Sequence, residues 1–370
     1  MAFGSTLNPK PSTRAPASQA AAPTVVGVGA RTHTGMTALQ AVLSIRANKM
    51  VPRESHIVDA GGAPIATCRL ASIADNVQGL ERFLALAAPA LVQACHPWLA
   101  LERIRFGEPR PLPLIVAVPS SSRPGFDKRL VTELLDRLAE SSRVPVDLRS
   151  SSVVTKCRGG GVEAFELALA KVRSGLHEAV VVGGVDSWFD PDVLEYLEAE
   201  RRLHGPECEN GFLPGEGAAF VVLGSGAGSL SLHRWGRVMS AATALEPRPY
   251  GSEEPCHALG MTAAIEKAVP ANARKARLIP WQLSDVHNER HRVDEWQIAR
   301  LRMFEAFRDD VVHDQPLLRA GDLGAASAAY LAVHAFVSWY VGCAPGDYAL
   351  VAAHSDGAER GAMLLSRATS

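Results

Sequence analysis

The chain has 370 residues, of which 47% are apolar, so it is long enough to bury a sizeable core. Its 38 Lys and Arg residues nearly balance its 39 Asp and Glu residues, and no long basic run occurs. This balance excludes a basic arm for nucleic acid and a strong attraction to acidic membranes. No apolar run reaches the length of a membrane span, so we expect neither nucleic acid nor a membrane as a partner.

The cysteines are widely spaced and form no CxxC pair. They are Cys68, Cys95, Cys157, Cys208, Cys256 and Cys343. This spacing argues against a zinc ribbon or a disulfide framework and indicates a reducing, cytoplasmic location. We expect no cofactor and no metal. Residues 1–22 are rich in Ala, Pro and Ser without the apolar centre of a secretory signal, which predicts a disordered tail.

The first predicted element is a short strand from Thr24 to Gly29, followed by a glycine-containing loop. A dinucleotide-binding fingerprint would need a further glycine at the position of Thr32, so we reject that interpretation. The pattern then predicts helices over Met36–Asn48, Leu80–Cys95 and Lys128–Ser142, a strand over Pro111–Val118, and extended chain over Val144–Val154.

The stretch from residue 153 to residue 188 is the most informative part of the sequence. Gly159, Gly160 and Gly161 permit a sharp turn. Apolar residues surround most of the segment Val162–Val172, which predicts a buried helix. Ala179–Val182 reads as a strand buried on both faces. A polar turn before a buried central helix is where α/β proteins place nucleophiles and anion sites.

The remaining chain alternates helices and strands, which predicts a layered α/β fold. After a flexible join at Gly224–Gly228, the layout begins again near Leu230. The predicted helices are Pro191–Leu203, Ala258–Val269, Val293–Phe307 and Gly321–Tyr340, and the predicted strands lie near Trp281–Val286, Tyr348–Ala353 and Gly361–Ser366.

Three segments resemble the β-ketoacyl synthases, which are condensing enzymes of the thiolase-like fold. The matching positions are Gly27, Gly29, Ala30, Thr32 and Gly35 in the first strand and loop, Gly161-Val162, Gly175 and Gly183-Gly184 around the buried helix, and Gly215-Glu216-Gly217-Ala218 before a later strand. The resemblance implies two similar βα halves, residues 23–229 and 230–370, in a five-layered αβαβα core. It also implies a homodimer, and a structural role for Glu216 with its carboxylate held by loop amides.

The condensing residues of the family are a Cys, two His and a Lys, and most of them are replaced here. A gapless count places the nucleophile on Arg158, which stays protonated and cannot accept an acyl group. His287 fits the first His position. Asp322 and Leu317 stand at the second His and the Lys, and we expect Asp322 to cap the following helix.

Cys157 lies one residue before the counted position, and two interpretations of it remain open. A neighbouring Arg and a helix start would both lower the pKa of its thiol, which suits a nucleophile. A buried structural thiol is the alternative. His287 and His291 are four residues apart, but no third ligand accompanies them, so a metal pair is not predicted.

The chain keeps the motifs that build the fold but lacks most of the condensing residues, and this combination favours a catalytically degenerate relative of the β-ketoacyl synthases. It would serve as a scaffold, adaptor or chaperone for a partner such as a type VI secretion effector, near which proteins of this kind are often encoded. One alternative is an active acyltransferase or 3-oxoacyl-ACP synthase that uses Cys157 with His287, and only then would an acyl carrier protein be a partner. Another is a chain-length-factor-like subunit. The neighbourhoods of Trp188, Trp281 and Trp296 are candidate partner surfaces.

Overall fold

The computed structural model describes residues 22–205, 208–225 and 233–368. The predicted disordered tail, apart from residue 22, lies outside the described residues. The predicted boundary between the halves, at residues 229 and 230, also lies outside them, so the exact division into halves stays a prediction.

Ten strands form one sheet in the order β10-β9-β11-β12-β8-β1-β7-β6-β4-β5. They are β1 (Thr24–Thr32), β4 (Leu114–Ala117), β5 (Ser152–Val154), β6 (Ala179–Ser187), β7 (Glu216–Gly224), β8 (Gly236–Leu245), β9 (Ile279–Ser284), β10 (Phe307–Asp314), β11 (Tyr348–His354) and β12 (Glu359–Arg367).

This sheet consists of two five-stranded halves with the same pairing pattern. In the order β1-β7-β6-β4-β5, two antiparallel pairs are followed by two parallel pairs. The order β8-β12-β11-β9-β10 repeats that pattern. Among the strands that the structure describes, the two halves pair only where Thr24 and Val25 of β1 lie beside the start of β8. The repeat is the one that a thiolase-like fold requires.

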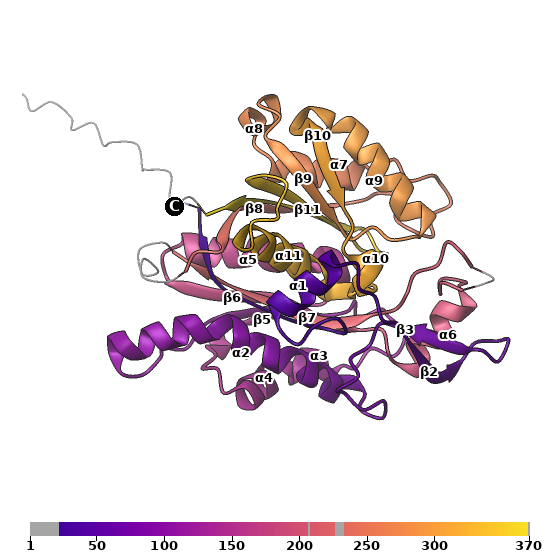
Figure 1. Ribbon diagram of the computed structural model, residues 1–370, viewed down its shortest axis with the longest axis horizontal. Coiled ribbons are helices and arrows are strands. Elements are labelled where there is room, and N and C mark those ends of the chain that lie inside the picture. The colour runs from indigo at the N-terminus through magenta and orange to yellow at the C-terminus, as the bar shows by residue number, and fades with distance from the viewer. Residues whose placement is uncertain (1–21, 206–207, 226–232, 369–370) are drawn as a thin grey trace, which may run out of the picture.

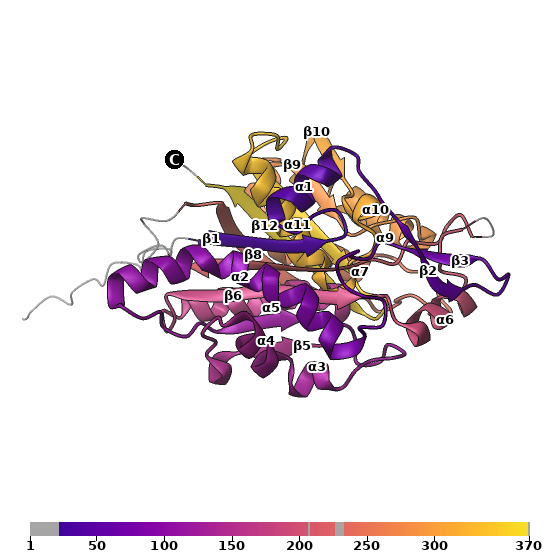
Figure 2. The same cartoon turned by 60° about the horizontal axis from the view of Figure 1, so that its bottom comes forward.

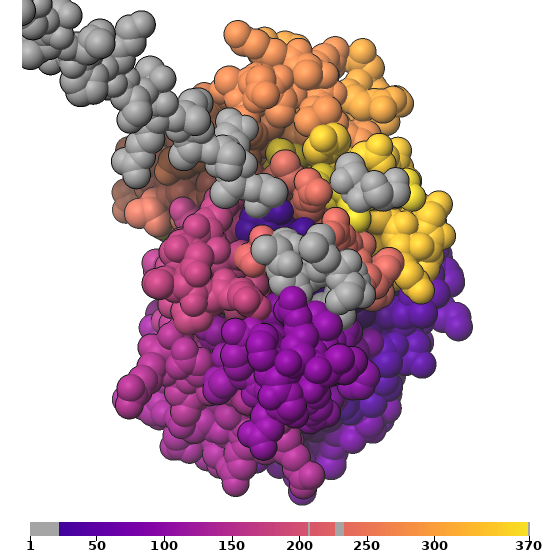
Figure 3. All heavy atoms as spheres, turned by 90° about the vertical axis from the view of Figure 1, so that its left-hand side faces the viewer, coloured from indigo at the N-terminus to yellow at the C-terminus, as the bar shows by residue number. Residues whose placement is uncertain are grey.

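Helices cover both outer faces and fill the space between the halves (Figure 1). The outer layers contain α2 (Gly79–Phe106), α3 (Arg129–Thr132) and α4 (Leu134–Ser142) on one side, and α7 (Leu259–Ala268) and α9 (Arg290–Arg302) on the other. The central layer contains α5 (Cys157–Arg173) and α11 (Ser327–Tyr340). The predicted five-layered αβαβα arrangement is therefore confirmed. In the space-filling view the second half (orange) lies above the first (indigo to magenta) (Figure 3).

Helix α11 is buried because its sequence offers apolar or small residues all round, whereas α5 keeps an exposed face that includes Glu166, Leu167 and Arg173. Every residue of α11 except Tyr340 is buried. Gly161 of α5 faces α11 so closely that a Cβ atom there would lie 2.8 Å from Ala328 Cβ. The two helices can pack at this distance only because small residues stand at the contact.

The remaining elements are shorter. They are α1 (Ala38–Arg46), α6 (Pro191–Ala199), α8 (Ala271–Lys275), α10 (Leu317–Ala320), the separate hairpin of β2 (Arg53–Val58) and β3 (Pro64–Thr67), and the 3-10 turns Leu148–Ser150, Phe304–Ala306 and Gly324–Ala326. The β2–β3 hairpin and β10 were not predicted. The segment predicted as a single helix, Lys128–Ser142, is instead broken at Glu133.

One helix, α2, is long and apolar enough to cross a membrane by length and composition alone. It runs well beyond the predicted Leu80–Cys95 and continues through Pro89 and Pro97. In both ribbon views α2 lies along the outer face of the first half (Figures 1 and 2), where it contacts β1 and β7. More than half of its apolar window is buried in that contact, as is typical of a core helix.

Candidate functional site

The first turn of α5 is the centre of a cluster of buried charged groups. Seven side chains form this ionic cluster: Arg158, Arg202, His287, Glu289, Arg292, Asp322 and Asp356. They come from the start of α5, the loops that follow α6, β9 and β11, the first turn of α9, and the segment before α11. The fold therefore brings together Arg158, His287 and Asp322, three of the four residues singled out from the sequence.

Arg158 and Asp322 form a two-pronged ion pair, and both side chains are buried. Arg158 Nε donates to Asp322 Oδ1 at 3.2 Å, and Arg158 Nη2 donates to Asp322 Oδ2. Gly324 N donates to Asp322 Oδ1 at 2.7 Å, and Trp188 Nε1 donates to the same oxygen at 3.4 Å. The prediction that Asp322 caps the long helix is wrong, because α11 begins at Ser327 with Ala326 before it and no side-chain cap bond, and Asp322 instead accepts from Gly324 N in the 3-10 turn upstream.

The ionisation of Asp322 decides what this side chain can do. Burial alone would raise its pKa, but the Arg158 guanidinium, followed by His287, holds the pKa well below its usual range. Asp322 is therefore an ionised carboxylate that only accepts hydrogen bonds. It cannot replace a histidine that donates a hydrogen bond to a substrate carbonyl.

His287 is occupied on both ring nitrogens. Nδ1 accepts from Glu289 N at 3.4 Å, so Nε2 carries the hydrogen and donates to Asp322 Oδ2 at 3.0 Å. The Phe212 ring stacks on the imidazole with centroids 4.9 Å apart. The imidazole is thus held in place by Asp322 and Phe212, with no N–H left for a ligand.

The outer part of the cluster links two more arginines to two carboxylates. Arg202 bonds to both oxygens of Glu289, at 2.6 and 3.0 Å, and to Asp356 at 2.9 and 3.1 Å. Arg292 bonds to Glu289 at 3.1 Å and also to Asp356. Burial opposes ionisation of Glu289, but its bonds to Arg202 and the charge of Arg292 lower its pKa to about 2. Three guanidinium groups and three carboxylates alternate, so the cluster is close to electrically neutral.

Cys157 lies at the edge of this cluster in a strained backbone conformation, with φ of +54°. Its side chain is 8% exposed. Burial raises the pKa of its thiol to about 11, and this effect exceeds the opposing charge of Arg158. The expectation that Arg158 and the helix start would lower the thiol pKa is therefore wrong, because desolvation dominates.

A second buried ion pair flanks the cluster. Arg123 Nη1 lies 2.8 Å from Asp186 Oδ1, and Asp186 Oδ2 accepts from Ala325 N at 2.7 Å. The Trp188 ring lies between two guanidinium groups, 4.6 Å from that of Arg123 and 5.3 Å from that of Arg158. The start of α5 is therefore surrounded by charged and aromatic side chains.

Glu216 has the structural role that the resemblance implies. Its carboxylate accepts from Leu70 N at 2.8 Å, from Arg82 at 2.5 and 2.8 Å, and from Ser187 Oγ at 2.7 Å. The hydrogen bond from a loop amide to Glu216 was predicted, whereas the ion pair with the buried Arg82 was not.

Two groups of side chains come close enough to hold a metal ion, and their bonding argues against it. They are Glu289, His291 and Asp356 in one place, and Glu246, Cys256 and Glu295 in another. The carboxylates of the first group bond to Arg202 and Arg292, and Glu295 accepts from Arg360 Nε at 2.6 Å and from Arg360 Nη2 at 3.0 Å. A cation would have to displace these guanidinium groups.

Sequence reasoning missed four members of the ionic cluster: Arg202, Glu289, Arg292 and Asp356. One signal was available, because charged residues 289–292 stand where the resemblance expects a Gly- and Thr-rich loop. The tryptophan prediction is wrong. Trp188, Trp281 and Trp296 are at most 4% exposed, since each packs in the core, and they form no partner surface.

Comparison with known proteins places this geometry in a family context. The sequence profile of the β-ketoacyl synthase N-terminal domain matches residues 146–227, which include the turn before α5, α5 itself and β7. No curated protein sequence matches the chain.

Solved ketosynthases have the same fold over almost the whole chain. The complex AntDE:AntF, a type II PKS acyl-carrier protein with its ketosynthase, matches at TM-score 0.75 and 14% identity over 95% of this chain and 100% of that chain. The ketosynthase from module 6 of the bacillaene synthase of Bacillus subtilis 168 matches at 0.72 and 12%, over 94% and 72%. The ketosynthase ApeO with its chain length factor ApeC from Xenorhabdus doucetiae matches at 0.71 and 12%, over 94% and 98%. The chain has the thiolase-like fold of the ketosynthases, and its residues 146–227 are similar to the N-terminal domain of the β-ketoacyl synthases.

Proposed function

We propose that this protein does not catalyse condensation and that it functions by binding another protein. The observation that carries the proposal is the Arg158–Asp322–His287 arrangement. A guanidinium group stands at the counted nucleophile position, and it is bonded to a carboxylate at the counted position of the second His.

The chemistry of condensation needs groups that this arrangement does not offer. An acyl acceptor must be a thiolate, and Cys157 has a raised pKa at a buried position. Two neutral donors must polarise the incoming carbonyl. Asp322 only accepts hydrogen bonds, and the N–H of His287 already donates to Asp322. A single substitution in this chain would therefore not restore the Cys, His, His and Lys set that condensation needs.

Intact-mass measurement tests the loss of activity. The protein is incubated with malonyl- and acyl-carrier thioesters, and the wild type is compared with Cys157→Ala and with Cys208→Ala as a matched control. We expect no acyl adduct in any of the three. An adduct that disappears only in Cys157→Ala would instead support the alternative, an acyltransferase or 3-oxoacyl-ACP synthase using Cys157 with His287, for which the acyl carrier protein would be the partner.

The partner is the second part of the proposal. Strand β5 ends the sheet and pairs only with β4 among the described strands, so its outer edge offers backbone groups to a second chain. This edge supports a homodimer formed through β5. We propose that the homodimer acts in the cytoplasm as a scaffold, adaptor or chaperone for a partner such as a type VI secretion effector, and the support for this role is the replacement of the condensing residues by Arg158 and Asp322. Native mass spectrometry of the purified chain tests the homodimer, and a monomer or a β5-independent dimer would contradict it.

A chain-length-factor-like subunit is the second candidate function. It is favoured by the likeness to solved complexes of a ketosynthase with a chain length factor, from ishigamide biosynthesis and from Xenorhabdus doucetiae. This candidate predicts a heterodimer with an active ketosynthase in place of the homodimer. Co-expression with a ketosynthase encoded beside it, followed by native mass spectrometry, distinguishes the two.

A further inference from the structure

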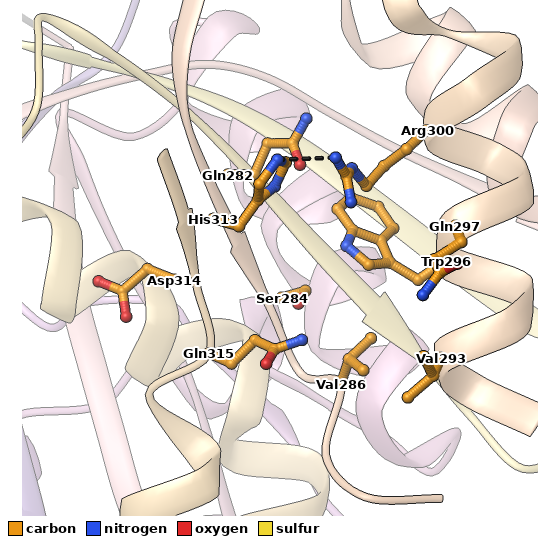
Figure 4. A pocket seen from close by; sticks show the side chains of 10 residues that line it. All are labelled: Gln282, Ser284, Val286, Val293, Trp296, Gln297, Arg300, His313, Asp314 and Gln315. Atoms are coloured by element: carbon orange, nitrogen blue, oxygen red, sulfur yellow. Dashed lines mark hydrogen bonds between the residues drawn. The ribbon is translucent and has the colours of Figure 1, made fainter. Parts of the chain in front are cut away.

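A cavity lies between α9 and the outer face of β9 and β10, and none of the seven residues of the ionic cluster lines it (Figure 4). Its volume is about 70 Å³, and a larger cavity of about 330 Å³ adjoins it. The two share Gln282, Gln297 and Arg300 in their walls. Together they reach the lower end of the size range of small-molecule sites.

Gln282 is the first sign that this cavity binds something. It lies on β9, a strand buried on both faces, where an apolar side chain is expected. The side chain is 1% exposed, and neither Oε1 nor Nε2 has a hydrogen-bond partner among the described residues. In Figure 4 the amide of Gln282 lies beside His313 and faces Arg300. A buried amide without a partner calls for an explanation, and a missing ligand is one.

Arg300 on α9 is the second sign. Its Nη2 donates to His313 Nε2 at 2.7 Å, and its buried Nε has no partner in the part of the chain that the structure describes. No carboxylate of the described residues lies within ion-pair distance of Arg300. Asp314 also lines the smaller cavity, but its carboxylate faces His334 and Arg46 and points away from Arg300 (Figure 4).

The other arginines around the larger cavity are already neutralised. Arg277 pairs with Asp309 at 2.7 Å, and Arg308 pairs with Asp310 at 2.7 Å. Arg300 therefore contributes the one uncompensated positive charge among the described residues that line the two cavities. A ligand with a single negative charge matches it, and a phosphate dianion does not.

The larger cavity adds an apolar wall beside this charge. Leu301, Phe304, Phe307 and Val311 line it. Leu301 is 74% exposed and Phe304 is 59% exposed, so apolar surface extends from the cavity to its mouth. A ligand held by Arg300 would place any chain that it carries against these side chains.

We propose that the two cavities form one binding site for a small monocarboxylate with a short apolar chain. Arg300 Nε and the Gln282 amide donate to the carboxylate, and the chain lies along Leu301 and Phe304. The proposal does not depend on the loss of condensing activity, because no residue of the ionic cluster lines either cavity.

Isothermal titration calorimetry at constant ionic strength tests the site with acetate, butyrate, hexanoate and inorganic phosphate. We expect affinity to rise about threefold for each added methylene group, with phosphate weaker than hexanoate. Arg300→Gln should weaken hexanoate binding by about tenfold or more. Arg290→Gln is the matched control, because Arg290 lies on the same helix, is 85% exposed and pairs with Asp294, and it should bind like the wild type.

The variant Gln282→Leu distinguishes a loss of ligand binding from a loss of folding stability. Because this change removes an amide without partners, we expect lost hexanoate affinity together with an unchanged or higher melting temperature without ligand. Absence of hexanoate binding to the wild type, or equal binding to Arg300→Gln, would overturn the proposal. Equal affinity for acetate and hexanoate would contradict the proposal that the ligand carries an apolar chain. Tighter binding of phosphate than of hexanoate would contradict the proposal that the ligand is a monocarboxylate.

Discussion

Two fully buried arginine–carboxylate pairs, Arg82–Glu216 and Arg158–Asp322, obey the same physics and do different things in this molecule. Glu216 is bonded to a loop amide and to Ser187, so its pair ties loops of the framework together. Asp322 is bonded to Arg158 and His287, two residues at counted chemical positions. The Arg82–Glu216 pair stabilises the framework of the fold, whereas the Arg158–Asp322 pair fills the candidate site.

The difference shows how such a site changes its role without loss of the fold. A buried charge is tolerated only when it is paired and hydrogen-bonded. Once Arg158 occupies the first turn of α5, a carboxylate at position 322 satisfies it where a neutral histidine would not. The loop after β9 and Asp356 extend the same pairing outward through Arg202 and Arg292.

The largest expected effect comes from leaving a buried charge unpaired. Asp322→Ala and Glu216→Ala should each lower the free energy of unfolding by about 3–5 kcal/mol, because Arg158 or Arg82 is then buried without its partner. Urea denaturation followed by circular dichroism measures both. A cost below about 1 kcal/mol for either variant would show that water reaches its arginine.

Double variants sharpen the comparison. Removing both partners, as in Arg158→Met with Asp322→Leu, should cost less than the two single changes together by at least about 1 kcal/mol. For Arg82→Met with Glu216→Leu, the difference between the double variant and the sum of the single variants should be smaller, since Leu70 N and the Ser187 hydroxyl also lose their acceptor. Equal recovery in both cycles would contradict the distinction between a pair that fills a site and a pair that joins loops.

Acid titration isolates the outer part of the ionic cluster. Glu289 has a pKa of about 2 against an ordinary value of 4.5, so its stabilising contribution is present above about pH 5 and is lost as the pH falls toward 2. Glu289→Gln should lower the free energy of unfolding by about 3 kcal/mol at pH 7 and by much less near pH 2. Chemical denaturation across this range measures the effect, with the exposed Glu253→Gln as control. A pH-independent difference would contradict the ionised cluster.

The smallest expected effect is at Cys157. Cys157→Gly relieves a left-handed backbone and removes a small buried side chain, so the free energy of unfolding should change by no more than about 1 kcal/mol. The same denaturation measurement applies. A loss several times larger would show that the thiol makes contacts that packing at this turn does not reveal.

The framework was predictable from the sequence because its signals are local. The apolar residues of α5 and the Gly-Glu-Gly run specify a buried helix and a strand by themselves. The turn predicted at residues 159–161 is wrong, because these glycines lie within α5, where they allow close contact with Glu359 and Ala328. The β2–β3 hairpin, edge strand β10 and the break at Glu133 were missed, since short or exposed elements carry weak periodicity.

The site was predictable only in part. Counting positions placed Arg158, His287 and Asp322 in one region, and the fold confirms that they meet. The sequence did not show that Arg202 and Asp356, which are 154 residues apart, would close the cluster. It also misjudged the Cys157 thiol, because the weight of burial against a neighbouring charge depends on tertiary packing.

The most direct test of the central claim is the native labelling rate of Cys157 with iodoacetamide, read at peptide level. We expect Cys157 to react only after unfolding in urea, while the less buried Cys208 is labelled in the folded protein as an internal control. Labelling of Cys157 in the native state as fast as that of a free thiol would contradict the loss of condensing activity, because the start of α5 would then present an open nucleophile.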